Sequence, residues 1–418
     1  MSLLTKRVGI SGRRLFAISL INAGTLSWYM FFSNTGAEIV FENFTTDSSL
    51  VAVGSALFFL TAGVSALVGV LLSKRISNKR FLWAWILFGV LSSAFTLFFK
   101  GDIFIFIFGP LLGIGMGLGF PYSFSLLGSH TDLEERGRAS GIMLFATFAF
   151  AMLAGFVTQL QFNNDIIATV AALVILKSTG FLGLVAADIS SSSKSANQLP
   201  SMSRIRIQEK NRNFLMYLIP WILFIITTVL IDHVVWPSLE QDPLIREVLS
   251  GPPYAYVATT IVALVAGYLA DRFGRKIPIF IGLAALGFSS ALLGSIVIPI
   301  TAFIHRIAIG VAFGFLMTAY SAIPGDLSEK SNAEKLYALV VVVPLLVYFG
   351  LGALPQYFGA SATAISVSWI LTSLILSSIV PVYLAKETLK EARIRARRIK
   401  EYLEKVCKVV EESDETKK

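Results

Sequence analysis

The chain has 418 residues, of which 55% are hydrophobic and only 15% charged, and its mean hydropathy is +0.73. Soluble domains average roughly 45–50% apolar and 25% charged residues, so this composition excludes an ordinary soluble protein and indicates a lipid environment. The net charge of +9 does not by itself indicate nucleic-acid binding, because basic residues also gather on the cytoplasmic side of membrane proteins. The single cysteine, Cys407, excludes an intramolecular disulfide framework and a thiolate metal cluster.

Apolar runs of about 20 residues, the length that crosses a bilayer as a helix, recur along the whole chain. In the first half they predict spans at 15–33, 50–72, 81–99, 103–127, 139–160 and 166–187. In the second half they predict spans at 214–236, 253–270, 277–298, 300–323, 337–358 and 362–385. The runs are too long for barrel strands of about 10 residues, so helices are the spanning structure they allow. The first run exceeds a signal-peptide core of about 7–15 residues, and we expect it to remain as the first span.

The positions of the 35 Lys and Arg residues predict the orientation of the chain. With twelve spans and the N-terminus inside, only Lys100 and Arg246 fall in outer loops, while Lys177 and Arg306 lie within spans. All the others fall in cytoplasmic segments, as the positive-inside rule requires. We therefore expect a multi-pass protein of the cell (plasma) membrane with both termini in the cytoplasm. Lys177, in the sixth span, is expected either to snorkel toward the surface or to pack inward.

The two halves of the chain resemble each other. A shift of about 197 residues places Gly113 and Gly117 of the fourth span on Gly310 and Gly314 of the tenth. Two similar halves imply a pseudo-two-fold axis along the membrane normal, which is the geometry of alternating access. The expected organisation is an N-terminal six-helix bundle at 1–187, a cytoplasmic linker at 188–213, a C-terminal six-helix bundle at 214–385 and a charged cytoplasmic tail at 386–418.

The short loop between the eighth and ninth spans carries the pattern G-x-L-x-D-R-x-G-R-K, formed by Gly267, Leu269, Asp271, Arg272, Gly274, Arg275 and Lys276. A weaker copy follows the second span, with Ser73 in place of the aspartate. In this loop, and in its twelve-span repeat, the chain resembles the major facilitator superfamily. The resemblance implies an all-α integral membrane fold of 12 transmembrane helices in two pseudo-symmetric six-helix bundles, and secondary transport.

The resemblance implies that this loop belongs to a gate. Asp271 is then expected to face the positive N-terminal end of the eleventh span, where a carboxylate is favourable. Arg275 is expected to reach an acid at the end of the tenth span, either Asp326 or Glu329. Contacts that exist only while the cytoplasmic side is closed would favour the outward-open state. We therefore expect these residues to control gating and not to bind the substrate.

In the resembled fold the first, fourth, seventh and tenth spans line a central cavity. Asp232 and Arg306 lie at similar depths in the seventh and tenth spans, roughly 6 and 9 Å from the outer ends at about 1.5 Å per residue. An ionisable group inside a bilayer costs about 2.5–3.5 kcal/mol, so each is a functional hypothesis. We expect either a pair that protonation or substrate breaks, or an ordinary end-of-helix charge at Asp232 and a structural ion pair at Arg306. Further candidates are His233, His305, Asn22, Tyr122 and Tyr320, with packing as the alternative for the last three.

The expected function is secondary active transport of a small solute across the cell membrane by alternating access, with protons as a candidate coupling ion. The sequence has no phosphate-binding loop, nucleophile motif or metal-ligand cluster, so we expect no enzyme activity and no cofactor. We expect a monomer in contact with membrane lipids and no nucleic-acid partner. Two alternatives are a transporter-derived sensor that binds a solute without moving it, and a membrane protein that handles lipids or glycans.

Overall fold

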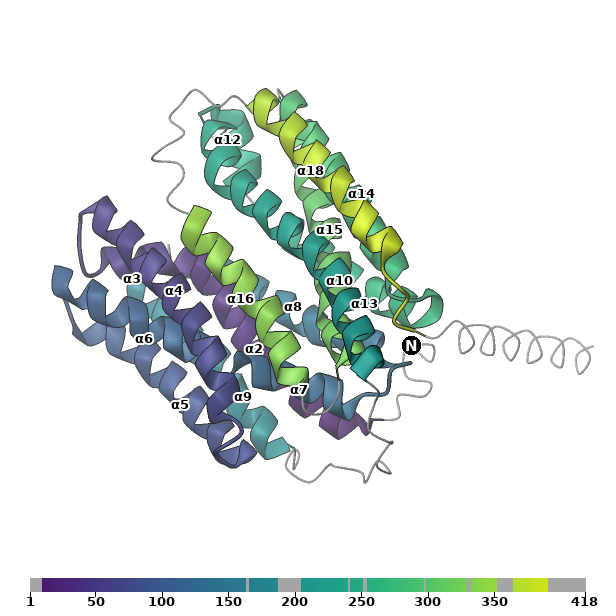
Figure 1. Ribbon diagram of the computed structural model, residues 1–418. Helices are drawn as coiled ribbons and strands as arrows, with labels where there is room; N and C mark the ends of the chain where they lie inside the picture. Colours follow the sequence, from purple (N-terminus) through teal and green to yellow (C-terminus); the bar gives the residue numbers. More distant parts are fainter. Residues whose placement is uncertain are drawn as a thin grey trace, which may run out of the picture.

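The structure is a computed structural model that describes residues 10–162, 165–186, 204–239, 241–250, 254–296, 298–328, 332–351 and 364–389. Within these ranges 12 helices are long and apolar enough to cross a membrane, and no strand occurs (Figure 1). The all-α fold with twelve spans is therefore confirmed. Most of the expected linker and almost all of the expected tail lie outside the described residues, as does Glu329.

The first half forms six spans, some of them built from several helical segments. Its segments are α2 (Gly12–Phe31), η1 (Phe32–Gly36), α3 (Ala37–Glu42), α4 (Ser48–Leu72), α5 (Asn78–Phe95), η2 (Thr96–Phe98), η3 (Asp102–Phe104), α6 (Ile105–Gly117), α7 (Phe120–His130), α8 (Arg136–Phe162) and α9 (Ile166–Ala186). The first span is longer than expected, because the π-helix η1 carries it on to Glu42 instead of ending it near residue 33. The fourth span is interrupted between α6 and α7.

The second half repeats this arrangement. Its segments are α10 (Arg204–Leu230), η4 (Ile231–Val235), α11 (Trp236–Leu239), α12 (Pro243–Ser250), α13 (Tyr254–Phe273), α14 (Lys276–Leu292), η5 (Leu293–Ser295), α15 (Pro299–Leu327), α16 (Ala333–Leu351) and α18 (Ala364–Leu384). Like the first span, the seventh contains a π-helix, η4, near one end. The tenth span, α15, is continuous where the fourth is broken.

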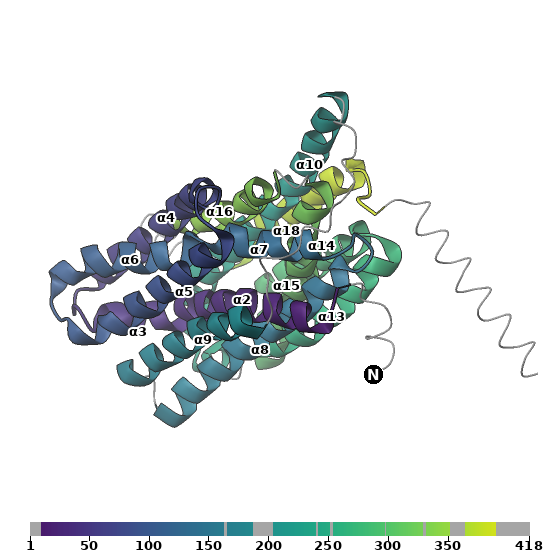
Figure 2. The same ribbon diagram turned by 90° about the horizontal axis from the view of Figure 1, so that it is seen from below.

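Two six-helix halves lie side by side (Figures 1 and 2). One cluster of buried apolar side chains lies mainly in the first half and extends into α13 and α16, and a second lies in the second half. They meet most extensively along two helix pairs, α8 with α13 and α4 with α16. At the first pair the backbones approach so closely that a Cβ on Gly267 would lie 2.5 Å from the carbonyl oxygen of Gly137. Glycine at these positions allows the contact, as small residues do at other helix crossings in membranes. The two halves therefore share an interface on both sides of the space between them.

Candidate functional site

Charged side chains from both halves meet at one end of the molecule, which we call the motif end because the 267–276 loop lies there. The motif network consists of Arg136, Arg138, Asp271, Arg275 and Asp326, whose side chains are at most 12% exposed. The arginines at 136 and 138 belong to the first half and the other three residues to the second. The network therefore ties the two halves together at this end.

Asp271, at the end of α13, binds the beginning of α8. Its two carboxylate oxygens accept hydrogen bonds from the backbone N–H groups of Gly137 at 2.8 Å and Arg138 at 2.9 Å. Its side chain also pairs with Arg138 at 3.0 Å and with Arg275 at 2.9 Å. A carboxylate is favourable here because the first N–H groups of a helix lack intrahelical partners and carry partial positive charge.

This contact corrects one expectation from the sequence. Asp271 faces the fifth span, α8, and not the eleventh, α16. The physical reason is the two-fold arrangement, in which the loop of each half meets a helix of the other half. The start of α16 instead faces the first-half copy of the motif, where the Ser73 hydroxyl donates to the Glu334 carboxylate at 2.6 Å.

Arg275 is the centre of the motif network. Its Nε lies 2.7 Å from Asp326 Oδ2, one of the two alternative acids expected for it. Its Nη2 donates to the Leu133 carbonyl at 2.8 Å. The second oxygen of Asp326 lies 2.7 Å from Arg136. Although burial opposes the charge, Asp326 and Asp271 raise the pKa of Arg275 above its usual value, so the guanidinium remains protonated.

The remaining motif residues shape the turn between α13 and α14. Gly274 has φ of +99°, a conformation that glycine adopts readily and other residues rarely do. The Glu387 carboxylate, beyond α18, accepts hydrogen bonds from the backbone N–H groups of Arg275 at 2.8 Å and Lys276 at 3.1 Å. Arg272 interacts with Tyr268. The turn is thus anchored by a segment that follows the last span.

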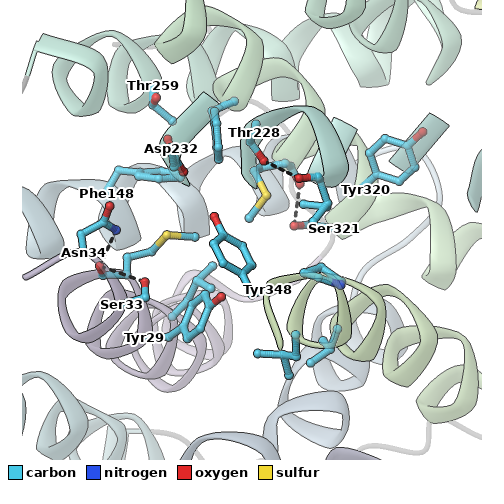
Figure 3. A pocket seen from close by; sticks show the side chains of 18 of the residues that line it. Tyr29, Ser33, Asn34, Phe148, Thr228, Asp232, Thr259, Tyr320, Ser321 and Tyr348 are labelled. Atoms are coloured by element: carbon cyan, nitrogen blue, oxygen red, sulfur yellow. Dashed lines mark hydrogen bonds between the residues drawn. The ribbon is translucent and has the colours of Figure 1, made fainter. Parts of the chain in front are cut away.

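A pocket of about 160 Å³ lies between the two halves (Figure 3). It is lined in the first half by α2, η1, α6, α7 and α8, and in the second half by α10, η4, α11, α13, α15 and α16. Most of the lining is apolar or aromatic, and its charged residues are Asp232 and Arg306. Such a cavity, apolar with a few polar groups that orient a ligand, is typical of small-molecule sites.

Asp232 and Arg306 lie at the same part of the pocket and interact electrostatically. The hydroxyl of Tyr348, on α16, also faces the Asp232 carboxylate. The guanidinium carbon of Arg306 lies 4.7 Å from the ring centre of Trp236, a cation–π geometry. The expected acid and base are therefore brought together, and aromatic side chains surround them.

The two histidines next to these residues do not line the pocket. His305 is fully buried and points toward α14, where Ser289 Oγ lies 2.8 Å from its Nδ1. His233 packs edge-on against Tyr348. Adjacent residues on a helix lie about 100° apart, so only one member of each doublet faces the pocket.

The other three candidates have separate roles. Tyr320 lines the pocket, and its hydroxyl donates to the Tyr217 carbonyl at 2.8 Å. Asn22 is fully buried outside the pocket and donates to the Ser123 carbonyl at 3.0 Å, which joins α2 to α7. Tyr122 packs edge-on against Phe81 and also lies outside the pocket.

The π-helix η1 places two polar residues in the pocket that no pattern in the sequence indicated. Ser33 and Asn34 on η1 line it from the first half, as Asp232 on η4 does from the second (Figure 3). A π-turn inserts one extra residue and rotates the following side chains, and such turns are frequent at functional sites. The two π-helices lie at nearly equivalent positions of the repeat. Comparing the two halves of the sequence could therefore have pointed from Asp232 on η4 to the polar residues on η1.

Comparison with known proteins supports this architecture. A search of curated proteins found no match to the chain. The profile of the Major Facilitator Superfamily matches residues 15–239 and 248–407, and these ranges overlap all twelve spans. With its twelve helices in two halves and a pocket between them, the chain belongs to the Major Facilitator Superfamily of membrane transporters.

Proposed function

We propose that the protein is a secondary active transporter that moves a small amphipathic organic solute across the cell membrane by alternating access. The pocket between the halves is the observation that supports this most strongly, because residues of both halves line it. Rocking of one half against the other changes the side from which such a pocket is reached. In this proposal residues 1–187 and 214–385 are the two moving bundles, joined by a cytoplasmic linker at 188–213, and the chain acts as a monomer.

The lining of the pocket supports the proposed class of solute. Apolar and aromatic side chains form most of the wall and suit a ring-sized apolar group. Asp232 and Arg306 form a polar end to which one charged or hydrogen-bonding group of the solute binds. A highly charged solute is disfavoured, since the described lining offers no further charge to balance it.

The motif network supports a gate on one side of this pocket. Its ion pairs join the two halves, so they hold the motif end closed in the conformation described here. We place this end in the cytoplasm, because the basic loops of the chain gather there and the positive-inside rule then holds. The conformation is accordingly assigned to the outward-facing side of the transport cycle, with both termini in the cytoplasm.

The first experiment measures binding and exchange. Benzoate, benzylamine and phenylalanine share a ring and carry an anion, a cation or both, so they probe the two charged residues of the pocket. At 100 times its Kd a bound probe stabilises the fold by about 2.7 kcal/mol, which raises the unfolding midpoint in detergent. A transporter then exchanges labelled for unlabelled probe in proteoliposomes. Binding without exchange would instead indicate a sensor, and binding of none of the three would contradict the proposed solute class.

The second experiment tests Asp232. Asp232→Asn keeps the size of the side chain and removes its charge, so we expect counterflow to fall at least about tenfold, as after loss of a charged contact of about 1.4 kcal/mol. If protons are coupled through this carboxylate, the pH dependence of uptake disappears as well. Asp102→Asn, at an exposed position outside the pocket, is the control. Unchanged uptake with unchanged pH dependence would remove Asp232 from the mechanism.

A further inference from the structure

Lys177, on α9, is buried inside the first half and takes no part in the central pocket. Its side chain is 1% exposed, and its amino nitrogen lies 3.0 Å from the carbonyl oxygen of Gly115 and 3.4 Å from the hydroxyl of Thr25. In the part of the chain that the structure describes, no carboxylate forms an ion pair with it. Lys177 therefore packs inward and does not snorkel toward the surface, which decides between the two alternatives that the sequence left open.

The oxygen that Lys177 binds lies where the fourth span is interrupted. The last backbone hydrogen bond of α6 runs from Leu118 N–H to the Ile114 carbonyl, and α7 begins at Phe120. Pro121 has no N–H, so the Gly117 carbonyl four residues earlier has no backbone donor there. The carbonyl groups at the end of α6 therefore lack intrahelical partners, which is costly inside a bilayer because lipid supplies no donor.

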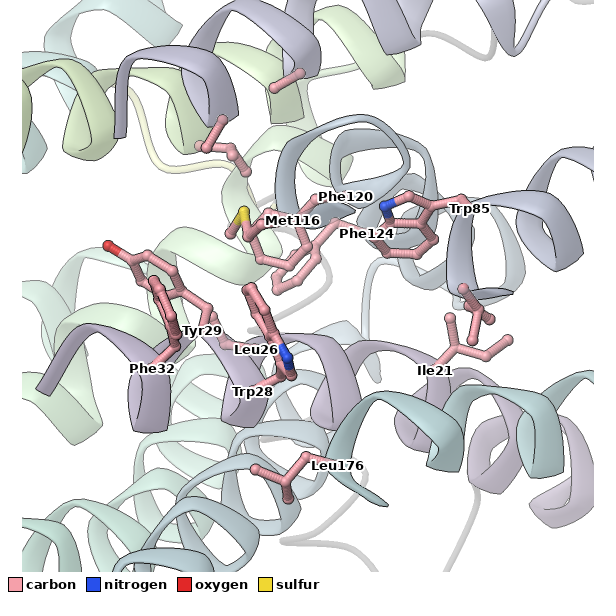
Figure 4. Close-up of a cluster of buried hydrophobic side chains, with 14 of the residues drawn as sticks. Ile21, Leu26, Trp28, Tyr29, Phe32, Trp85, Met116, Phe120, Phe124 and Leu176 are labelled. Atoms are coloured by element: carbon pink, nitrogen blue, oxygen red, sulfur yellow. The ribbon is translucent and has the colours of Figure 1, made fainter. Parts of the chain in front are cut away.

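The surroundings of Lys177 hold its amino group at this break. The nitrogen lies 3.9 Å from the ring centre of Trp85 and 5.8 Å from that of Trp28, both within the buried cluster shown in Figure 4. A Cβ on Gly89 would lie 2.5 Å from Lys177 Cε, and a Cβ on Gly119, inside the break, would lie 2.2 Å from the Trp85 ring. The lysine, the indole ring and the break are thus packed as one unit.

The second half supplies an internal comparison. The shift of about 197 residues places Thr318 at the position of Pro121 and Leu374 at the position of Lys177. Thr318 has the N–H that proline lacks, and α15 is continuous from Pro299 to Leu327. The half that has the break has the buried lysine, and the half without the break has a leucine.

We propose that Lys177 is a positioning residue that holds the break in the fourth span by donating hydrogen bonds to the carbonyl end of α6. The break separates Met116 from Phe120, and both line the central pocket. Lys177 thereby fixes part of the pocket wall from outside the pocket. This goes beyond the proposed transport, and its test requires no substrate.

The test measures the geometry of the fourth span directly. Spin labels on cysteines at Phe106, 49% exposed on α6, and at the exposed Ser129 on α7 report the distance across the break by pulsed electron resonance, in a Cys407→Ser background. We expect one narrow distribution in the parent. Lys177→Met keeps the length of the side chain but removes its donors, so the distribution broadens or lengthens toward the roughly 35 Å backbone span of an unbroken helix over this segment.

Three further variants make the result decisive. Gly89→Ala displaces Lys177 Cε without changing any charge, so it should give a milder form of the same change and serves if Lys177→Met does not fold. Adding Pro121→Thr to Lys177→Met copies the second half and should restore a narrow distribution at a longer distance. Leu374→Met, the matched change in α18, should leave the distribution unaltered. Parent-like distributions in folded Lys177→Met and in Gly89→Ala would overturn the proposal.

Discussion

Arg275 and Asp326 form a fully buried ion pair, with Nε of Arg275 2.7 Å from Oδ2 of Asp326 and both side chains 0% exposed. The other oxygen of the same carboxylate binds Arg136, which begins α8 in the opposite half. One aspartate therefore forms an ion pair with an arginine of each half. Two buried guanidinium groups without it would repel each other in a low dielectric, so the closed motif end depends on this carboxylate.

Asp326→Asn is expected to open the motif end. Breaking a buried ion pair by removing one partner costs about 3–5 kcal/mol, and this cost applies only while the network is assembled. A cysteine at Ser321, which lines the pocket on the same helix, should then react faster with an impermeant maleimide added from the motif end. Each 1.4 kcal/mol by which the closed state is destabilised corresponds to about a tenfold increase in the labelling rate.

The control for this change is Asp132→Asn, an exposed acid at the same end of the molecule. An exposed charge contributes about 0–1 kcal/mol, so labelling should change little. Equal labelling rates in the parent and in Asp326→Asn would show that the network does not hold the end closed.

Ser73→Asp is expected to weaken the other half of the gate, although it restores the residue type of the second-half motif. Ser73 donates to the Glu334 carboxylate at 2.6 Å, and an aspartate there would place two like charges together. Close like charges near a surface repel by about 4 kcal/mol at 4 Å and an effective dielectric constant of 20. The Ser321 cysteine should again label faster, whereas Ser73→Asn, without charge, should stay within about twofold of Ser73→Ala. Slower labelling of Ser73→Asp would contradict the repulsion.

Gly267→Ala is expected to separate α8 from α13. The new Cβ would lie 2.5 Å from the Gly137 carbonyl, and the backbone on both sides leaves no flexible atom to move. Overpacking of this kind costs about 1–3 kcal/mol and should lower the unfolding midpoint in detergent. Gly155→Ala on α8, where nothing lies within 4 Å, is the matched control and should be neutral or stabilising by up to about 1 kcal/mol. Equal midpoints for the two variants would exclude a close helix crossing.

Gly274→Ala tests the anchor that Glu387 provides to the turn. Gly101 and Gly274 both have positive φ, of +116° and +99°, but only at Gly274 would a Cβ meet another group, the Glu387 carboxylate at 2.5 Å. Each alanine should cost about 1–2 kcal/mol from the left-handed backbone. Gly274→Ala should cost measurably more in thermal unfolding, because it also displaces the carboxylate from the Arg275 and Lys276 N–H groups. An equal loss at both glycines would mean that the Glu387 contact contributes nothing.

The residues that line the pocket show which parts of the site could be predicted from the sequence. The rarity of charge inside spans selected Asp232 and Arg306, and both line the pocket. Asn22 and Tyr122 were expected as polar residues on spans that line the cavity in the resembled fold, but they lie outside the pocket, because the rotation of a side chain about its helix depends on packing. It passed over Ser33 on η1, because a π-turn has no mark in the local sequence.

The sequence by itself determined that the chain lies in a lipid bilayer, that it has twelve spans and that its two halves are similar. Lipid satisfies no backbone group, so each crossing must be a long apolar helix, and such helices are visible as runs of residues. Only the tertiary structure decided which helix each loop meets. Asp271 binds α8 and Ser73 faces α16 because the halves are related by a two-fold arrangement that exchanges their partners. It also decided that Lys177 lies inside the first half. A buried amino group needs an acceptor, and the Gly115 carbonyl comes next to Lys177 only when the helices have packed.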